Sequence, residues 1–281
     1  MKKKLRTRRN SSLEGAILEA FSFVSAIVIL LPIVWTAFVS FRPEFSTFGN
    51  VFSYFTPPYT LDNYVTIFSK SKVFRWILNS FIVTGSVTGL TVLLCALAAY
   101  PMAKMKFFGK RFLSTYLLIG LMVPTEATIV SLYTLVKDMS MLNSYAGLIV
   151  PVLAGSMNVI ITINFFSGIP DELLEAAKID GASEWQIFTH VILPLGKTVM
   201  ISVAIFTFIR NWNNFLWPFL CAMNEDMFTL TVGIPAFIST YNDTLAMPMT
   251  VSMVASIPLF LFYMIFEKRI VRGIALTGVK G

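Results

Sequence analysis

The sequence predicts an all-α integral membrane protein with six transmembrane helices and a helix-turn-helix loop on the cytoplasmic side. Of its 281 residues, 56% are hydrophobic and only 13% are charged, and the mean hydropathy is +0.74. Six apolar runs are long enough to cross a bilayer, which takes about 20 residues per helix. Lys and Arg gather in short segments that flank these runs, a pattern typical of membrane topology. We therefore expect a multi-pass protein of the cell (plasma or inner) membrane, in contact with lipid.

The same composition argues against several other classes of protein. The net charge of +7 does not indicate nucleic-acid binding, because the basic residues flank apolar runs and form no single basic patch. Cys95 and Cys221 stand in separate apolar runs, and the one histidine, His190, has no companions, so we expect no disulfide, no metal site and no catalytic residues. Residues 196–198, Gly-Lys-Thr, imitate the end of a phosphate-binding loop, but Val191 stands where its first glycine belongs. We expect this chain to bind no cofactor.

The predicted transmembrane domain, residues 17–267, lies between two basic segments. Residues 1–16 and the tail, residues 268–281, are both rich in Lys and Arg, so the positive-inside rule puts both termini in the cytoplasm. The six spans are predicted at residues 17–41, 76–100, 112–136, 144–166, 196–221 and 246–266. Lys and Arg are far commoner in the segments that this arrangement places inside than in those that it places outside.

The segment between the first two spans is aromatic and polar. Pro57 and Pro58 block a helix there, and Leu61, Tyr64 and Phe68 then recur at helical spacing. We expect a short helix at the outer interface. In the second span, residues 85 and 89 are glycines four positions apart, which suits close helix contact in lipid.

The third span contains two residues that interrupt an apolar run, Pro124 and Glu126. A carboxyl group within the membrane is costly and usually faces the bundle or a water-filled path, so Glu126 is a candidate for the solute path. The alternative is that it pairs with a polar neighbour and fixes packing. The fourth span carries Asn158 and Asn164.

Residues 169–195 form a long water-compatible segment in a chain that is otherwise apolar. Pro170 suits the first position of a helix, Gly181 suits a helix end, and Ser183 with Gln186 has the spacing of a capping box. Pro194 closes the unit. We expect a helix, a glycine corner and a second helix, in a place where the protein meets a soluble partner. The alternative is an ordinary amphipathic surface hairpin.

The fifth span contains an unusual cluster of amide and aromatic side chains. Amide groups hydrogen-bond hydroxyls, and aromatic faces cover the apolar faces of sugar rings. The cluster therefore indicates a path for a polar solute, and its residues are Asn211, Trp212, Asn213, Asn214, Phe215 and Trp217. The alternative is an aromatic belt at the outer interface with polar residues that hold helices together. Residues 222–245 contain no Lys or Arg and are predicted to form an outer loop.

Three short runs resemble a known family. Glu175-Ala176-Ala177, followed by Gly181 and then Ile192-Leu193-Pro194, is similar to the EAA loop of permease subunits in binding-protein-dependent ABC importers. The wider loop resembles the carbohydrate-uptake branch, the maltose type. The WNNFLWP run at 212–218 resembles the signature of sugar permeases, and the last nine residues resemble the family's C-terminal ending. Thr198, where a proline is common, and Glu267-Lys268-Arg269 depart from the family pattern.

The resemblance implies that the loop is a coupling helix that docks in a cleft of a cytoplasmic ATPase subunit. The residues expected to make or shape that contact are Glu172, Glu175, Ala176, Ala177, Asp180, Gly181, Ala182, Leu193 and Pro194. ATP and Mg²⁺ would then be bound by two partner ATPase subunits and not by this chain. A second, nonidentical permease and an extracytoplasmic solute-binding protein would complete the importer.

The resemblance thus predicts a transport subunit, not an enzyme, that moves a carbohydrate, with an oligosaccharide favoured. A permease for another polar solute, such as a glycerol phosphodiester or a polyamine, is the main alternative. A secondary transporter would need acidic residues for ion coupling within its spans, and only Glu126 lies well inside one. A membrane enzyme would need a catalytic constellation, for which one histidine and two separated cysteines give little material.

Overall fold

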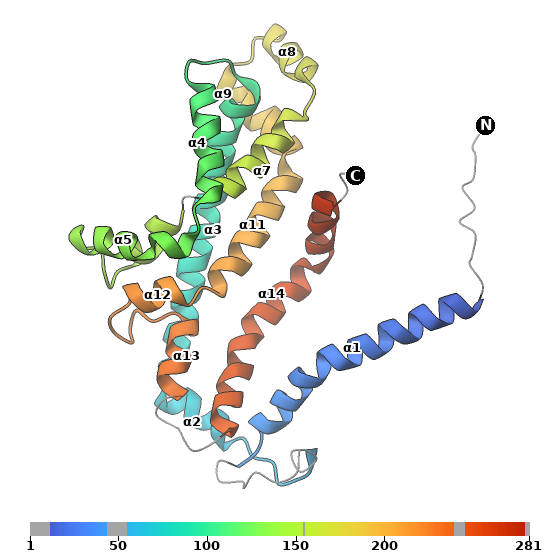
Figure 1. Ribbon diagram of the computed structural model, residues 1–281, viewed down its shortest axis with the longest axis vertical. Coiled ribbons are helices and arrows are strands. Elements are labelled where there is room, and N and C mark those ends of the chain that lie inside the picture. The colour runs from blue at the N-terminus through green and yellow to red at the C-terminus, as the bar shows by residue number, and fades with distance from the viewer. Residues whose placement is uncertain (1–11, 44–54, 154, 239–244, 279–281) are drawn as a thin grey trace. The chain divides into compact units, whose positions relative to one another are not determined.

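The computed structural model describes residues 12–43, 55–153, 155–238 and 245–278, and every regular element in these ranges is a helix (Figure 1). The described chain divides into two compact units. One unit takes in the chain up to Lys70 together with residues 238–254. The other takes in residues 71–237 and the chain from Ala255 onward. The predicted all-α membrane protein is confirmed.

The first unit is built from α1 (Ser12–Ser40), α2 (Asp62–Lys70) and the beginning of α14 (Ala246–Gly278). Its polar centre is the backbone carbonyl of Ser40, which accepts hydrogen bonds from Nδ2 of Asn63 at 3.1 Å and from Oγ1 of Thr250 at 2.9 Å. All three residues are buried, so these bonds satisfy groups that water cannot reach. Helix α2 confirms the short helix predicted around residues 61–68.

The second unit begins with a long helix, α3 (Val73–Lys104). The helices that follow it are α4 (Lys110–Met122), α5 (Thr125–Asp138), α6 (Tyr145–Ile149), α7 (Ser156–Ser167), α8 (Asp171–Ile179), α9 (Glu184–Ile187), α10 (Leu193–Leu195), α11 (Lys197–Trp212), α12 (Leu216–Cys221) and α13 (Leu230–Ile238). A π-helical turn, Phe188–Ile192, joins α9 to α10.

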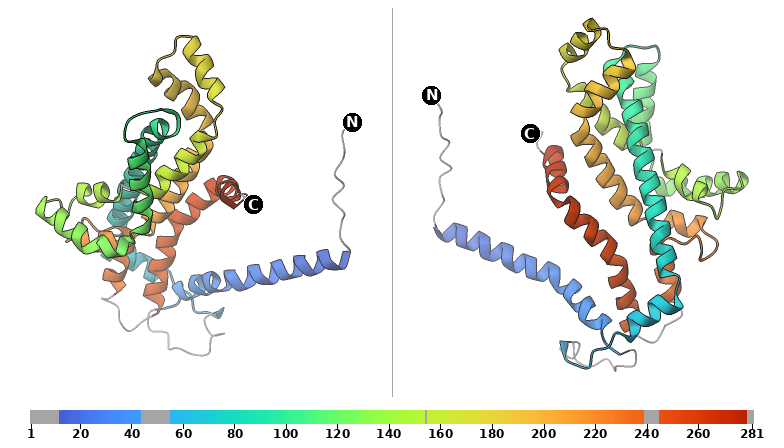
Figure 2. Two further views of the ribbon diagram at one scale, coloured as in Figure 1. Left: turned by 45° about the horizontal axis from the view of Figure 1, so that its top comes forward. Right: turned by 180° about the vertical axis from the view of Figure 1, so that it is seen from behind.

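Helices α3, α7 and α11 lie side by side and form the core of this unit (Figures 1 and 2). Small residues on α3, such as Ala96 and Ala99, let Phe166 of α7 and Val203 of α11 pack closely against it. Helices α8 and α9 lie at one end of α3, and α12 and α13 lie toward its other end (Figure 2). A single helix of 32 residues therefore runs between the hairpin and the segment that holds the amide and aromatic cluster.

Among the described residues, three helices are long and apolar enough to cross a membrane, namely Gly15–Ser40, Val73–Lys104 and Ala246–Glu267. The number of candidate spans rises to six if each of three bent helix pairs forms one span. The predicted span at 112–136 is not one straight helix, because α4 and α5 meet at 103°. The break falls at Pro124, which has no N–H to continue a helical ladder. The predicted span at 196–221 is also broken, between Trp212 and Leu216.

The first part of the predicted outer loop is fastened to the start of α3. The Nδ2 atom of Asn79 donates to the carbonyls of Asp226 and Phe228 at 2.7 and 2.8 Å, and Nε1 of Trp76 donates to the carbonyl of Glu225 at 3.1 Å. Lys72 adds an ion pair with Asp226 at 2.9 Å. The hydrogen bond from Lys72 lowers the pKa of the Asp226 carboxyl. Residues 239–244 of this loop lie outside the described part of the chain.

Candidate functional site

The hairpin of residues 169–195 turns at a glycine with left-handed backbone geometry. Gly181 has φ +82°. Its N–H donates to the carbonyl of Lys178 at 3.0 Å, and the N–H of Ala182 donates to that of Ala177 at 2.9 Å. This pair of bonds is a Schellman motif, which satisfies the last carbonyls of α8 and needs a residue that tolerates positive φ. The predicted glycine corner is confirmed.

The second helix of the hairpin begins with the predicted capping box. Oγ of Ser183 accepts from the N–H of Gln186 at 3.3 Å, and Oε1 of Gln186 accepts from the N–H of Ser183 at 2.8 Å. Such a cap supplies partners for backbone groups at a helix start. The π-helical turn that follows buries Phe188 and Ile192 against α3 and α7. The corner is therefore anchored in the core of the unit.

Two side chains in the last turns of α3 bind the two helices of the hairpin. Nζ of Lys104 lies 2.6 Å from Oδ1 of Asp171 and also donates to the carbonyls of Ser167 and Ile169. The Lys104 side chain is only 4% exposed, although its partner Asp171 is on the surface. Its hydrogen bond lowers the pKa of the Asp171 carboxyl. Lys104 thus fixes the start of α8.

Tyr100 fixes the start of α9. Its hydroxyl donates to Oε2 of Glu184 at 2.6 Å, and Oε1 of Glu184 lies 2.7 Å from Nζ of Lys178 on α8. The Tyr100 ring also contacts that of Phe188, with centroids 5.4 Å apart. Glu184 therefore joins α3, α8 and α9 at one carboxylate.

The residues expected to contact an ATPase divide into an outward-facing set and an inward-facing set. Ala177, Ala182 and Leu193 are partly buried and pack against the core of the unit. The exposed ones are Glu172, Glu175, Ala176, Asp180, Gly181 and Pro194. Large apolar side chains share this exposed surface: Ile179 is 86% exposed, and Leu173 and Trp185 are exposed as well. The hairpin thus has an apolar and acidic exposed surface, and its bonds to α3 hold that surface in place.

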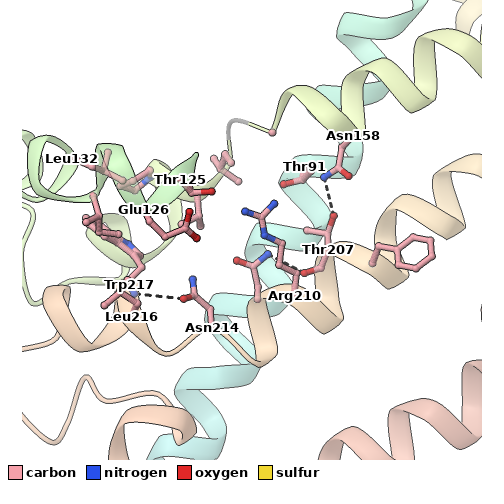
Figure 3. Close-up of a pocket in the computed structure, with 17 residues that line it drawn as sticks. Thr91, Thr125, Glu126, Leu132, Asn158, Thr207, Arg210, Asn214, Leu216 and Trp217 are labelled. Carbon is pink, nitrogen blue, oxygen red and sulfur yellow. Dashed lines mark hydrogen bonds between the residues drawn. The ribbon is translucent and has the colours of Figure 1, made fainter. Parts of the chain in front are cut away.

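A polar cavity of about 330 Å³ lies in the same unit, between α3, α5, α7 and α11 (Figure 3). Its volume is at the lower end of the range for ligand pockets, so it fits a small ligand or one end of a longer one. Its polar lining consists of Thr91, Thr125, Glu126, Asn158, Thr207, Arg210, Asn211 and Asn214. Phe206 and Trp217 add aromatic surface.

The structure places four of the predicted solute-path residues in the lining of this cavity and three elsewhere. Glu126, Asn211, Asn214 and Trp217 line it. Of the other three, Trp212 is buried between Phe81 and Phe208, Asn213 bonds the carbonyl of Ile209 at 2.8 Å, and Phe215 stacks on Phe219. The structure therefore does not bring Trp212, Asn213 and Phe215 into the cavity, because the chain turns between α11 and α12.

Hydrogen bonds within the lining hold several of its side chains in place. Nδ2 of Asn158 donates to Oγ1 of Thr207 at 3.2 Å, and Nδ2 of Asn211 donates to the carbonyl of Thr207 at 2.9 Å. The buried indole of Trp217 donates to the carbonyl of Gly147 at 3.0 Å. The amide oxygens of Asn158 and Asn211 form no hydrogen bond within the described chain, so both are available as acceptors.

Sequence reasoning assigned no role to Arg210, Thr91 and Thr207, which also line the cavity. Arg210 is the one basic residue far from the ends of a predicted span, since Lys197 stands at the start of its span, and a charge inside a span is a signal for a functional residue. The two threonines give no such signal, because a lone threonine in an apolar run fits lipid-facing and core positions equally well. Within the described residues, no group of three or more His, Cys, Asp or Glu side chains is placed to hold a metal ion.

The family of binding-protein-dependent transport system inner membrane components matches residues 91–275. The arabinooligosaccharide transport system permease protein AraQ of Halalkalibacterium halodurans is 30% identical over 93% of this chain and 94% of its own length. The trehalose/maltose transport system permease protein MalG of Thermococcus litoralis is 30% identical over 97% of this chain and 99% of its own length.

The fold is also found in a solved structure. A chain in the crystal structure of a bacterial ABC transporter involved in the import of the acidic polysaccharide alginate matches with a TM-score of 0.81 and 18% sequence identity. The match covers 92% of this chain and 97% of that chain. Because only 18% of the residues are identical, this match shows a shared fold and not a shared solute.

Proposed function

We propose that this chain, which belongs to the family of binding-protein-dependent transport system inner membrane components, is the permease subunit of an ATP-driven importer for a carbohydrate. Relatives that match nearly the whole chain are permease proteins of sugar transport systems. Membership in this family makes the chain a membrane component of a transport system and not itself an enzyme. ATP and Mg²⁺ would be bound by two separate ATPase subunits.

One observation carries the proposed contact with an ATPase: the hairpin has exposed apolar side chains on a rigid frame. Several exposed apolar side chains on one short element, here Leu173, Ile179 and Trp185, are typical of a surface that another protein covers. Tyr100 and Lys104 bind the hairpin to α3, so a force on α8 or α9 passes directly to a helix of 32 residues. We therefore assign ATPase docking to residues 169–195.

The polar cavity supports a solute path through the same unit. Its amide, hydroxyl and charged groups suit a ligand rich in hydroxyls, and the rings of Phe206 and Trp217 suit the apolar face of a sugar. Uptake of a glycerol phosphodiester or a polyamine instead of a sugar would support the alternative solute classes. A second, nonidentical permease and an extracytoplasmic binding protein would complete the transport system.

The proposed mechanism is a shift between two arrangements of the complex. Binding-protein docking on one side and ATPase closure on the other would together favour the outward-facing arrangement, because each partner binds that arrangement more tightly. In this chain, α3 would carry the hairpin motion toward the cavity, and Thr91 of the cavity lining lies on that same helix.

The test compares two substitutions at the glycine corner in the purified importer. Asn tolerates positive φ better than most residues, so Gly181→Asn keeps the backbone and adds an uncharged side chain. Gly181→Asp adds a charge of the sign already abundant on this surface. We expect Gly181→Asp to reduce the amount of ATPase subunit that co-purifies and the sugar-stimulated ATP hydrolysis, and Gly181→Asn to reduce both less. Unchanged co-purification and unchanged hydrolysis in Gly181→Asp would contradict docking at this corner.

A further inference from the structure

A buried hydroxyl group in the lining of the polar cavity has no hydrogen-bond partner. Thr91 lies on α3, is only 2% exposed and lines the cavity. Its Oγ1 forms no hydrogen bond with any described residue. Buried side-chain oxygens without a partner are rare, and each one needs an explanation. A ligand that contacts Thr91 would supply the missing partner.

The groups around Thr91 offer further unused bonds. Thr91, Asn158 and Thr207 lie together at one end of the cavity (Figure 3). Oγ1 of Thr207 accepts from Asn158 at 3.2 Å and donates to no described group, while the amide oxygen of Asn158 accepts from none. The hydroxyl groups of Thr91 and Thr207 can therefore each donate a hydrogen bond to a ligand, and the amide oxygen of Asn158 can accept one. Sugar hydroxyls do both.

The charges in the lining limit which ligands fit. Arg210 and Glu126 both border the cavity, carry opposite charges and form no ion pair within the described chain (Figure 3). The two charges cancel, so the lining has no net charge that would favour an anionic or a cationic sugar. An uncharged sugar can bond to both side chains. Phe206, which is exposed, supplies a ring face in the same lining.

We infer that the end of the cavity at Thr91 is a binding subsite for one uncharged sugar residue, and that the Thr91 hydroxyl binds the solute directly. This inference rests on the proposed function, since it assumes that a carbohydrate passes through this subunit. The inference goes beyond the proposed function in two ways. Thr91 on α3 becomes a residue that determines specificity, and the solute is a neutral sugar and not an acidic one.

The test uses the intact importer in proteoliposomes with its binding protein, and maltotriose, arabinotriose and trigalacturonate as probes. Thr91→Val removes the hydroxyl at nearly constant volume, and Thr91→Ser keeps it. Thr88→Val is the matched control, because Oγ1 of Thr88 is also buried without a partner on α3 but Thr88 does not line the cavity. Co-purification of the ATPase and thermal stability show that each variant is assembled.

We expect the wild type to transport at least one neutral trisaccharide and not trigalacturonate. Thr91→Val should raise the half-saturating concentration for that sugar about tenfold, the effect of losing one hydrogen bond, with Thr91→Ser and Thr88→Val close to wild type. A Thr91→Val variant that transports like wild type, or a Thr88→Val variant with an equal loss, would overturn the subsite. Equal transport of trigalacturonate would overturn the neutral class. A wild-type complex that transports none of the three probes, and whose ATP hydrolysis no other sugar stimulates, would overturn the carbohydrate function itself.

Discussion

The hydroxyl of Tyr100 donates a hydrogen bond of 2.6 Å to the carboxylate of Glu184, so the end of α3 is bonded to the first residue of α9. The same carboxylate pairs with Lys178 of α8. Three helices therefore meet at one side chain, and the position of the hairpin depends on contacts that single substitutions can remove.

Replacing Tyr100 with Phe should loosen the hairpin without disturbing the core. The ring contact with Phe188 stays, but the bond to Glu184 is lost, at a cost of about 1 kcal/mol because Glu184 is partly exposed. We expect a small fall in the thermal unfolding temperature and a larger fall in sugar-stimulated ATP hydrolysis. Tyr116→Phe, at an exposed tyrosine of α4, is the control. Equal sugar-stimulated hydrolysis in the two variants would show that the bond between Tyr100 and Glu184 does not help the hairpin to couple ATP hydrolysis to transport.

Replacing Lys104 with Met should free the start of α8. The ammonium group binds two backbone carbonyls and Asp171 from a nearly buried position, and Met fills similar space without a charge. We expect faster hydrogen exchange in residues 171–179, measured by mass spectrometry, with little change in α3. Lys106→Met, on the exposed loop after α3, should leave exchange in α8 as in wild type. Protection of α8 that survives in Lys104→Met would contradict the role given to this lysine.

Gly147 should tolerate no side chain. A Cβ atom there would overlap the carbonyl of Met141 and lie 3.0 Å from Sγ of Cys221. Gly147→Ala should therefore destabilise the protein by about 1–3 kcal/mol, as overpacking does. Gly85→Ala is the matched control, since its Cβ would meet nothing within 4 Å and alanine favours helix. A lower thermal unfolding temperature is expected in the first variant only, and equal temperatures would show that the chain relaxes around Gly147.

The tether between Lys72 and Asp226 should hold throughout the neutral pH range. The hydrogen bond from Lys72 lowers the pKa of Asp226 below its ordinary value of 3.8. A lowered carboxyl pKa gives a contribution that is complete above the ordinary value and is lost as pH falls through the lowered one. A spin label at exposed position 223 should therefore keep one mobility from about pH 5 to about pH 8 and gain mobility only below pH 3.8.

The control for the tether is Asp226→Asn, in which the label should already be as mobile at neutral pH as it is in the wild type below pH 3.8, with no further change as pH falls. The backbone carbonyls of residues 225, 226 and 228 still accept bonds from α3 in this variant, so the loop should stay folded. A label whose mobility is the same in both proteins would show that those backbone bonds alone hold the loop.

The hairpin could be predicted in detail because its signals are local. Gly181 provides the left-handed corner, and Ser183 and Gln186 cap the next helix with side chains only three residues apart. The attachment to Tyr100 and Lys104 could not be predicted, since it joins residues that are 84 and 67 positions apart.

The cavity could be predicted only in part. The amide and aromatic run identified Asn211, Asn214 and Trp217, but the same reasoning included Trp212, whose ring is instead enclosed by Phe81 and Phe208. The composition of residues 211–217 does not show which of their side chains point into the cavity, because the helix breaks between α11 and α12. Thr91 reaches the cavity from a distant helix, and that depends on how α3 packs against α11.

Helix α1 has apolar side chains along almost its whole length, yet none of its most apolar window is buried within the chain. Such a helix gains its favourable surroundings from acyl tails or from another subunit and not from its own protein. Its depth in the bilayer should therefore follow lipid thickness, and detergents with short alkyl tails should lower the yield of intact subunit before they affect α3, whose window is one-third buried.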